Sequence, residues 1–108
     1  MVNNFAPWDV WLANVAFEDK PLEYKARPVV ILSTGEVFIL SLKVTTHAPR
    51  SGWGEYALIK WQAAGLTKPS TVRISKLLRI APTDMIKKLG KLHTLDIMNI
   101  QQILSLKR

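Results

Sequence analysis

The sequence predicts a mostly β protein with helical appendages (α+β), in which short antiparallel strands form a compact barrel. Val29 to Leu32 are four consecutive large apolar residues, three of them β-branched, which fits a central strand buried on both faces. Apolar residues alternate with others along 37–45 and 71–80, as they do in half-buried strands. Between residues 95 and 106 the apolar spacing becomes helical, which predicts a C-terminal helix.

We expect the first strand at 9–15, a stretch rich in β-forming residues. A polar loop over 16–26 leads to the second strand, 27–33. Pro28 suits the first position of that strand because it has no N–H to donate. Arg27 then lies where the chain enters the sheet, and its guanidinium points away from the core.

A tight turn at 34–36, with glycine supplying the positive φ, leads to a third strand over 37–45. One face of that strand becomes polar toward its end, which indicates that it leaves the core and lines a surface. Residues 46–54 read as an irregular loop and 56–59 as a short strand. We expect 61–65 to form a helical turn with its glycine as C-cap.

The strand over 71–80 is ended by Pro82, and Thr83-Asp84 favours a short helix from there to Leu89. Thr94 is the expected N-cap of the final helix, 95–106. The sequence therefore predicts five strands followed by helices.

The chain has 108 residues, which is enough for one domain with its own core, and we expect a single domain over 1–108. Hydrophobic residues make up 48% and the mean hydropathy is +0.09, as in a globular chain. No apolar run approaches the roughly 20 residues that a bilayer-spanning helix needs. Residues 1–5 lack the charged and apolar regions of a signal peptide. We therefore expect no membrane association.

Cysteine is absent from the sequence, which excludes a disulfide framework, thiolate metal ligands and a cysteine nucleophile. His47 and His93 are the two histidines, so we expect neither a structural zinc site nor any other cofactor.

The net charge is +7, and it is unevenly distributed. Six of the eight acidic residues precede Lys60, whereas ten of the fifteen basic residues lie from Lys60 onward. A basic half of this kind favours a polyanionic partner, either nucleic acid or an acidic protein segment. The alternative is that these charges only keep the protein soluble.

Five segments, taken in order, resemble a known family. They are Pro7–Ala13, Lys25–Ser33 with its Arg-Pro-apolar pattern, Val44–Thr46, Thr71–Ile74, and Lys88–Leu92 with the following helix. They are similar to the opening, the strand-end threonine motif, the later strand and the C-terminus of the MazF/PemK family. These proteins are the toxins of bacterial type II toxin–antitoxin modules, and the resemblance spans nearly the whole chain.

The resemblance implies a small SH3-like antiparallel barrel of the MazF/PemK/CcdB type, usually a homodimer. It implies an mRNA interferase, an endoribonuclease that cleaves single-stranded RNA at short sequences without a metal. It also implies neutralisation by a cognate antitoxin and a cytoplasmic location, for a protein that is bacterial or encoded by a phage or plasmid.

Carried over by position, Arg27 matches the family's catalytic arginine and Thr45 its active-site threonine, with Thr46 as the alternative register. Arg73 matches a second arginine used in the plasmid-borne branch. That branch has an aspartate two positions further on, where this chain has Ser75. A serine cannot replace a carboxylate base, so this departure bears directly on catalysis.

Metal-free RNA cleavage needs a base for the 2′-OH, an acid for the leaving 5′-oxygen and stabilisation of the phosphorane. Arg27, always protonated, suits a phosphate clamp that stabilises the transition state. Thr45 or Thr46 can hydrogen-bond a phosphate oxygen. Histidine is the side-chain type that suits acid–base work near neutral pH, and His47 follows immediately. The alternative for His47 is an ordinary solvated loop histidine.

The loop before Arg27 supplies other base candidates, although it lacks the glycine of the Gly-Ser-Glu-Gln-like loop found in many relatives. Trp53 and Tyr56 either stack on bases or pack at the barrel rim. The full set expected to contact RNA besides the catalytic residues is Glu18, Asp19, Lys43, Thr46, Arg50, Trp53, Arg73 and Ser75.

Three further expectations concern partners and function. The final helix carries more apolar residues than one stripe needs, which favours a two-fold partner as well as packing on the barrel. A basic RNA groove also suits an acidic antitoxin that competes with RNA. The alternative function is a non-catalytic nucleic-acid- or protein-binding module on the same barrel.

Overall fold

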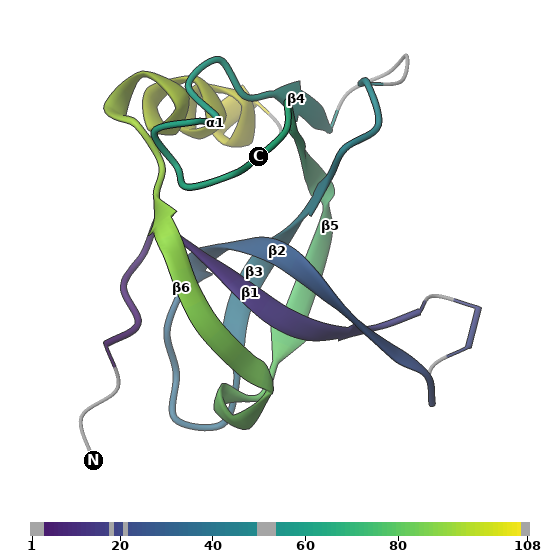
Figure 1. Ribbon diagram of the computed structural model, residues 1–108. Helices are drawn as coiled ribbons and strands as arrows, with labels where there is room; N and C mark the ends of the chain where they lie inside the picture. The colour runs from purple at the N-terminus through teal and green to yellow at the C-terminus, as the bar shows by residue number, and fades with distance from the viewer. Residues whose placement is uncertain (1–3, 18, 21, 50–53, 107–108) are drawn as a thin grey trace.

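The computed structural model describes residues 4–17, 19–20, 22–49 and 54–106 of the chain. Figure 1 shows how the elements are arranged. In chain order they are β1 (Asp9–Ala16), β2 (Tyr24–Ser33), β3 (Ile39–Thr45), β4 (Glu55–Ala57), β5 (Thr71–Ile80), the 3₁₀ turn η1 (Pro82–Asp84), β6 (Met85–Lys91) and α1 (Thr94–Leu106).

Six strands of the described chain form one antiparallel sheet in the order β4-β5-β3-β2-β1-β6. The mostly β fold with a C-terminal helix is confirmed. The sheet is strongly curved (Figure 1), but β4 and β6 stay at its two edges, so it does not close on itself.

The central strand β2 is buried on both faces, as its sequence predicts. Val29, Val30 and Ile31 are each fully buried. Val30 belongs to a large apolar cluster and Val29 to a smaller one, because successive side chains point to opposite faces of the sheet. The large cluster extends from the sheet to Ile100 of α1, so the helix covers one face.

The prediction that β2 begins at Arg27 was wrong, because the strand begins at Tyr24. Residues 24–28 pair with β1 although their composition is that of a polar loop. Pairing with β3 starts only at Val29↔Lys43. At Pro28 the strand therefore has a neighbour on one side only, which is the edge-like position that proline tolerates.

The helix predicted from Asp84 to Leu89 was also wrong. Its capping residues produce only the single turn η1, in which the Asp84 N–H donates to the Ala81 carbonyl at 2.8 Å. The following residues form β6, which pairs along the free edge of β1. Edge pairing supplies the backbone hydrogen bonds that a helix would otherwise supply, so tertiary context decides this segment.

Smaller differences concern element ends. The third strand begins at Ile39 instead of residue 37, and the short strand lies at Glu55–Ala57 instead of 56–59. The cap of α1 is His93 instead of Thr94: its Nδ1 accepts the Leu95 N–H at 3.0 Å, and its carbonyl accepts the Ile97 N–H.

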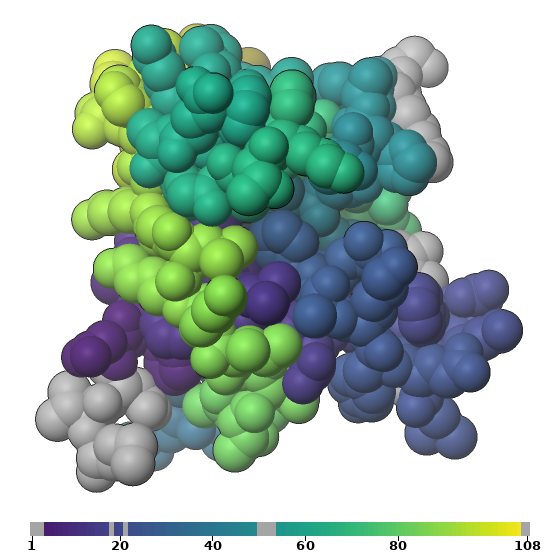
Figure 2. All heavy atoms as spheres, viewed as in Figure 1, coloured from purple at the N-terminus to yellow at the C-terminus, as the bar shows by residue number. Residues whose placement is uncertain are grey.

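The turn at 61–65 is confirmed, with Gly65 at φ +83°. Leu66 donates back to the Trp61 carbonyl and Gly65 to that of Gln62, which is the Schellman pattern. This turn packs on β6 so closely that a Cβ on Gly65 would lie 2.0 Å from the Leu89 carbonyl oxygen. Figure 2 shows the segment between β4 and β5 (teal to green) lying against β6 and α1.

Candidate functional site

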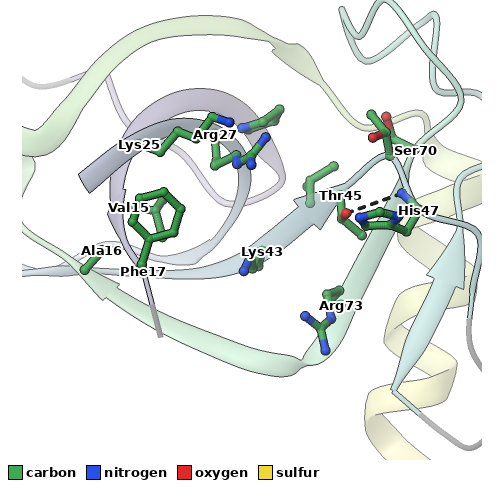
Figure 3. A pocket seen from close by; sticks show the side chains of 13 residues that line it. Val15, Ala16, Phe17, Lys25, Arg27, Lys43, Thr45, His47, Ser70 and Arg73 are labelled. Carbon is green, nitrogen blue, oxygen red and sulfur yellow. Dashed lines mark hydrogen bonds between the residues drawn. The ribbon is translucent and has the colours of Figure 1, made fainter. Parts of the chain in front are cut away.

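An open groove of about 290 Å³ lies where the ends of β1, β2, β3 and β5 come together. It shares Val15 with the smaller core cluster, so part of its lining is apolar and buried. Figure 3 shows Phe17 at one end of the groove and Thr45, His47 and Ser70 at the other. Its full lining is Val15, Ala16, Phe17, Lys25, Arg27, Pro28, Lys43, Val44, Thr45, Thr46, His47, Ser70 and Arg73.

The groove brings together all three residues predicted to be catalytic and three of those predicted to contact RNA. These are Arg27, Thr45 and His47, with Lys43, Thr46 and Arg73. They come from three separate strands and the loop after β3. The sheet therefore gathers residues that are up to 46 positions apart in the sequence (27 to 73).

Strand register explains this convergence. Lys43 pairs with Val29 of β2 on one side and with Arg73 of β5 on the other. Arg27 lies two residues before Val29 and Thr45 two residues after Lys43, so alternation puts both on the same face of their strands as the Val29–Lys43 pair. The β3–β5 register also shifts between Leu42 and Lys43, and such irregularities re-aim side chains beside sites.

Thr45 and His47 are joined by a local turn. The backbone N–H of His47 donates to Oγ1 of Thr45 at 3.3 Å, drawn as a dashed line in Figure 3. The Thr45 hydroxyl oxygen is thus an acceptor within the turn, and its hydrogen can be donated to a ligand oxygen. The His47 side chain is exposed, so its imidazole is accessible from solvent.

The charged side chains in the described lining of the groove are all positive. Lys25, Arg27, Lys43 and Arg73 line it, and no carboxylate is among the described lining residues. At its margin, an ion pair joins Arg73 Nε to Glu55 Oε2 at 3.2 Å. Four cations around one concave surface create a positive potential that attracts and retains anions.

Three contributors were missed by the sequence reasoning. Lys25 carried a signal, because it lies two residues before Arg27 and period two places both on one face of a strand. The polar composition of residues 16–26, which is typical of a loop, conceals this signal. Ser70 and Glu55 carried none, because each reaches the site only through long-range pairing of the β4 and β5 region.

Some predicted RNA contacts lie elsewhere. Asp19 is exposed between β1 and β2 and does not line the groove. Ser75 donates its N–H to the Gly54 carbonyl at 3.1 Å and also lies outside the lining. Gly54 has φ +100°, and a Cβ there would meet the Ser75 side chain at 2.7 Å. Glu18, Arg50 and Trp53 fall outside the described residues.

A second polar cluster lies between β4 and α1. Asp96 is fully buried and accepts the hydroxyl of Tyr56 at 2.5 Å and the backbone N–H groups of Ile59 and Lys60 at 3.0 and 2.8 Å. Asn99 Nδ2 donates to the Tyr56 oxygen at 2.9 Å. Burial, together with the hydrogen bond to Asp96, raises the pKa of Tyr56 to about 12. The phenol therefore stays protonated and ties β4 to the helix.

Among the described residues, no three histidine or carboxylate side chains are grouped so that they can hold a metal ion. No helix in the same part of the chain is long and apolar enough to cross a membrane.

Comparison with protein-family models and with curated protein sequences finds no match. Comparison with solved structures gives a close match in fold to the Mycobacterium tuberculosis toxin MazF-mt6, with a TM-score of 0.70. The match covers 89% of this chain and 91% of that one, at 22% sequence identity. The fold of this chain is therefore similar to that of a MazF toxin, as the sequence resemblance predicts.

Proposed function

We propose that this chain is a toxin-type endoribonuclease that cleaves single-stranded RNA without a metal ion. The observation that carries the proposal is the groove itself, in which Arg27, Thr45 and His47 lie among cations with no carboxylate in the described lining. A polyanion with an accessible backbone is the ligand that such a groove favours. The fold similarity to a MazF toxin supports the same reading.

Each residue has a chemical role in this proposal. The Arg27 guanidinium clamps the scissile phosphate and stabilises the charge that develops on the phosphorane. Thr45 donates its hydroxyl hydrogen to a phosphate oxygen. His47 either accepts the proton of the 2′-OH or donates a proton to the leaving 5′-oxygen, because its exposed imidazole lines the same groove as Arg27 and Thr45.

The direct experiment incubates the protein with a pool of single-stranded RNA and with DNA of the same sequences. We expect cleavage of RNA alone, because the nucleophile is the 2′-OH, and equal rates with and without EDTA. A requirement for metal would contradict the mechanism, and an intact RNA pool would contradict the activity.

We also propose that an acidic, partly disordered antitoxin lies across the groove and competes with RNA. Both ligands present spaced negative charge to the same cations, so their association rates should fall as salt rises. A non-cleavable RNA and the antitoxin should exclude one another. Simultaneous binding with neither affinity reduced would show that the sites are separate.

A homodimer is proposed from α1. Leu95, Met98 and Leu106 are exposed by 39%, 60% and 75%, although Ile100 of the same helix is fully buried. Apolar residues left outside the core are available to a second copy. Sedimentation at micromolar concentration should show a species of about twice 12.2 kDa.

The second candidate is a non-catalytic RNA-binding module with the same groove. Ser75 stands where a relative has a carboxylate, and the described lining contains none. This candidate predicts salt-dependent RNA binding without cleavage in the experiment above.

A further inference from the structure

The acidic side chain that contacts the groove is Glu55, on the margin of the site. Glu55 of β4 and Arg73 of β5 are directly opposite one another in the strand register. Oε2 of Glu55 accepts from Nε of Arg73 at 3.2 Å, and the two side chains are only 11% and 20% exposed. The contact is therefore sheltered from the solvent that weakens ordinary surface ion pairs.

The residues on both sides of Glu55 are held in place by hydrogen bonds. The carbonyl of Gly54 accepts the Ser75 N–H, and the Tyr56 hydroxyl is bonded to Asp96 of α1. A carboxylate fixed in this way restricts the guanidinium that it contacts. Because Nε is the atom engaged, the outer edge of the guanidinium, with its two Nη atoms, stays available for a second planar ligand.

Arg73 also has a cationic neighbour. Lys43 pairs with it from β3, so two positive side chains stand opposite one another on the same face. Like charges in that position repel and drive flexible side chains apart. Glu55 lies on the far side of Arg73 from Lys43 in the strand order, where its charge offsets this repulsion.

We propose that Glu55 is a positioning residue that holds Arg73 through Nε, so that the Nη edge of the guanidinium receives an RNA phosphate in the groove. The proposal rests on the proposed endoribonuclease function and assigns a carboxylate to that site from β4. Glu55 acts through Arg73 and does not itself contact RNA.

The sign of the effect on RNA binding separates this role from simple electrostatics. Removing an acid beside a basic groove raises the positive potential and should strengthen binding if charge alone matters. If Glu55 positions Arg73, its removal should weaken binding in spite of the added positive charge. A purely structural role would change the unfolding midpoint and leave the affinity of the folded protein unaltered.

The experiment compares the wild-type protein with Glu55→Ala and Glu55→Gln. The readouts are the rate of single-stranded RNA cleavage and the affinity for a 2′-O-methyl RNA oligonucleotide, which lacks the nucleophile. We expect Glu55→Ala to lower kcat/KM about 10-fold and to weaken binding, because misplacing a phosphate ligand is costly. Glu55→Gln keeps an acceptor for Nε and should lie between Ala and wild type.

Glu36→Gln is the matched control, because it removes the same charge from the exposed β2–β3 turn, outside the groove lining. It should leave both readouts unchanged or slightly strengthen binding. The positioning role is overturned if Glu55→Ala, shown to be folded by circular dichroism, binds and cleaves as well as wild type or Glu36→Gln.

A double substitution tests whether the effect passes through Arg73. Once Arg73→Ala has been made, adding Glu55→Ala should cause no further loss of cleavage or binding. A full additional loss would show that Glu55 acts independently of Arg73 and would overturn the proposal. If wild-type protein binds the oligonucleotide but leaves RNA intact, the endoribonuclease function fails while the binding readout still tests Glu55.

Discussion

Neighbouring residues of β4 belong to two polar regions with opposite properties. Tyr56 joins the cluster under α1, where Asp96 is fully buried and three donors surround its carboxylate. Glu55 lies at the margin of the groove, where it contacts Arg73, one of the cations of a described lining that holds no acid. Internally satisfied polar groups stabilise the fold, whereas charges left to solvent are available to a ligand. Substitutions in the first region should therefore lower stability, and substitutions of cations in the second should lower RNA cleavage or binding.

The largest effect on stability should come from the buried carboxylate. Asp96→Ala leaves two backbone N–H groups and the Tyr56 hydroxyl without their acceptor, so we expect the free energy of unfolding to fall by about 3 kcal/mol or more. Urea denaturation measures this loss. Glu36→Ala, an exposed acid in a turn, is the control and should change stability by less than about 0.5 kcal/mol. Equal losses of stability at both positions would contradict a stabilising role for the buried Asp96 carboxylate.

The largest effect on activity should come from Arg27. Its side chain is exposed at the edge of the core, so Arg27→Ala should fold normally. Loss of one preorganised donor should slow RNA cleavage about 100-fold or more. Cleavage time courses check the rate, and urea denaturation checks that stability is unchanged. A folded variant that cleaves RNA at the wild-type rate would show that Arg27 does not bind the scissile phosphate.

Tyr56 should make the free energy of unfolding depend on pH. Its pKa is about 12 in the folded protein against 10.0 ordinarily, so the unfolded chain loses the phenol proton first. The stabilising contribution is complete below pH 10 and declines as the pH rises from 10 to 12. Tyr56→Phe should lack this decline. The measurement is the difference in unfolding free energy between the two proteins at pH 9 and pH 11; a constant difference would contradict it.

The two regions also differ in how far the sequence could predict them. In the groove, Arg27 and Thr45 were expected from resemblance, and the polar face of the third strand was expected from its alternation. Lys25 could be placed on the same face by the same reasoning, but the polar composition of residues 16–26 favours a loop over the strand that forms there. Local pattern thus predicts which residues share a face wherever the strand itself is recognised.

Features that depend on pairing between residues distant in the sequence could not be predicted. The segment 85–91 contains three lysines and a glycine, and it became a strand because β1 offered an open edge. Asp96 resembled an ordinary first-turn acid of a helix, yet its acceptors serve the backbone of residues 59 and 60. Glu55 meets Arg73 only through the β4–β5 register. None of these partners is near in sequence, so no local pattern reports them.

The smallest effect should come from Lys25, an exposed cation at the groove margin. A lysine contact with a phosphate acts as a point charge and releases about one counterion when RNA binds. Lys25→Ala should therefore weaken binding only a few-fold at moderate salt and lower the slope of log K against log salt by about 0.7.

The control for Lys25 is Lys87, an exposed cation on β6 outside the groove lining. Both variants lose one positive charge, so any effect of net charge alone is shared between them. Fluorescence titrations of a labelled single-stranded 2′-O-methyl RNA at several salt concentrations measure both slopes. The slope should fall for Lys25→Ala and stay at the wild-type value for Lys87→Ala, because counterion release requires direct contact with phosphate. Identical slopes for the two variants would mean that RNA follows the overall charge of the protein and does not occupy this groove.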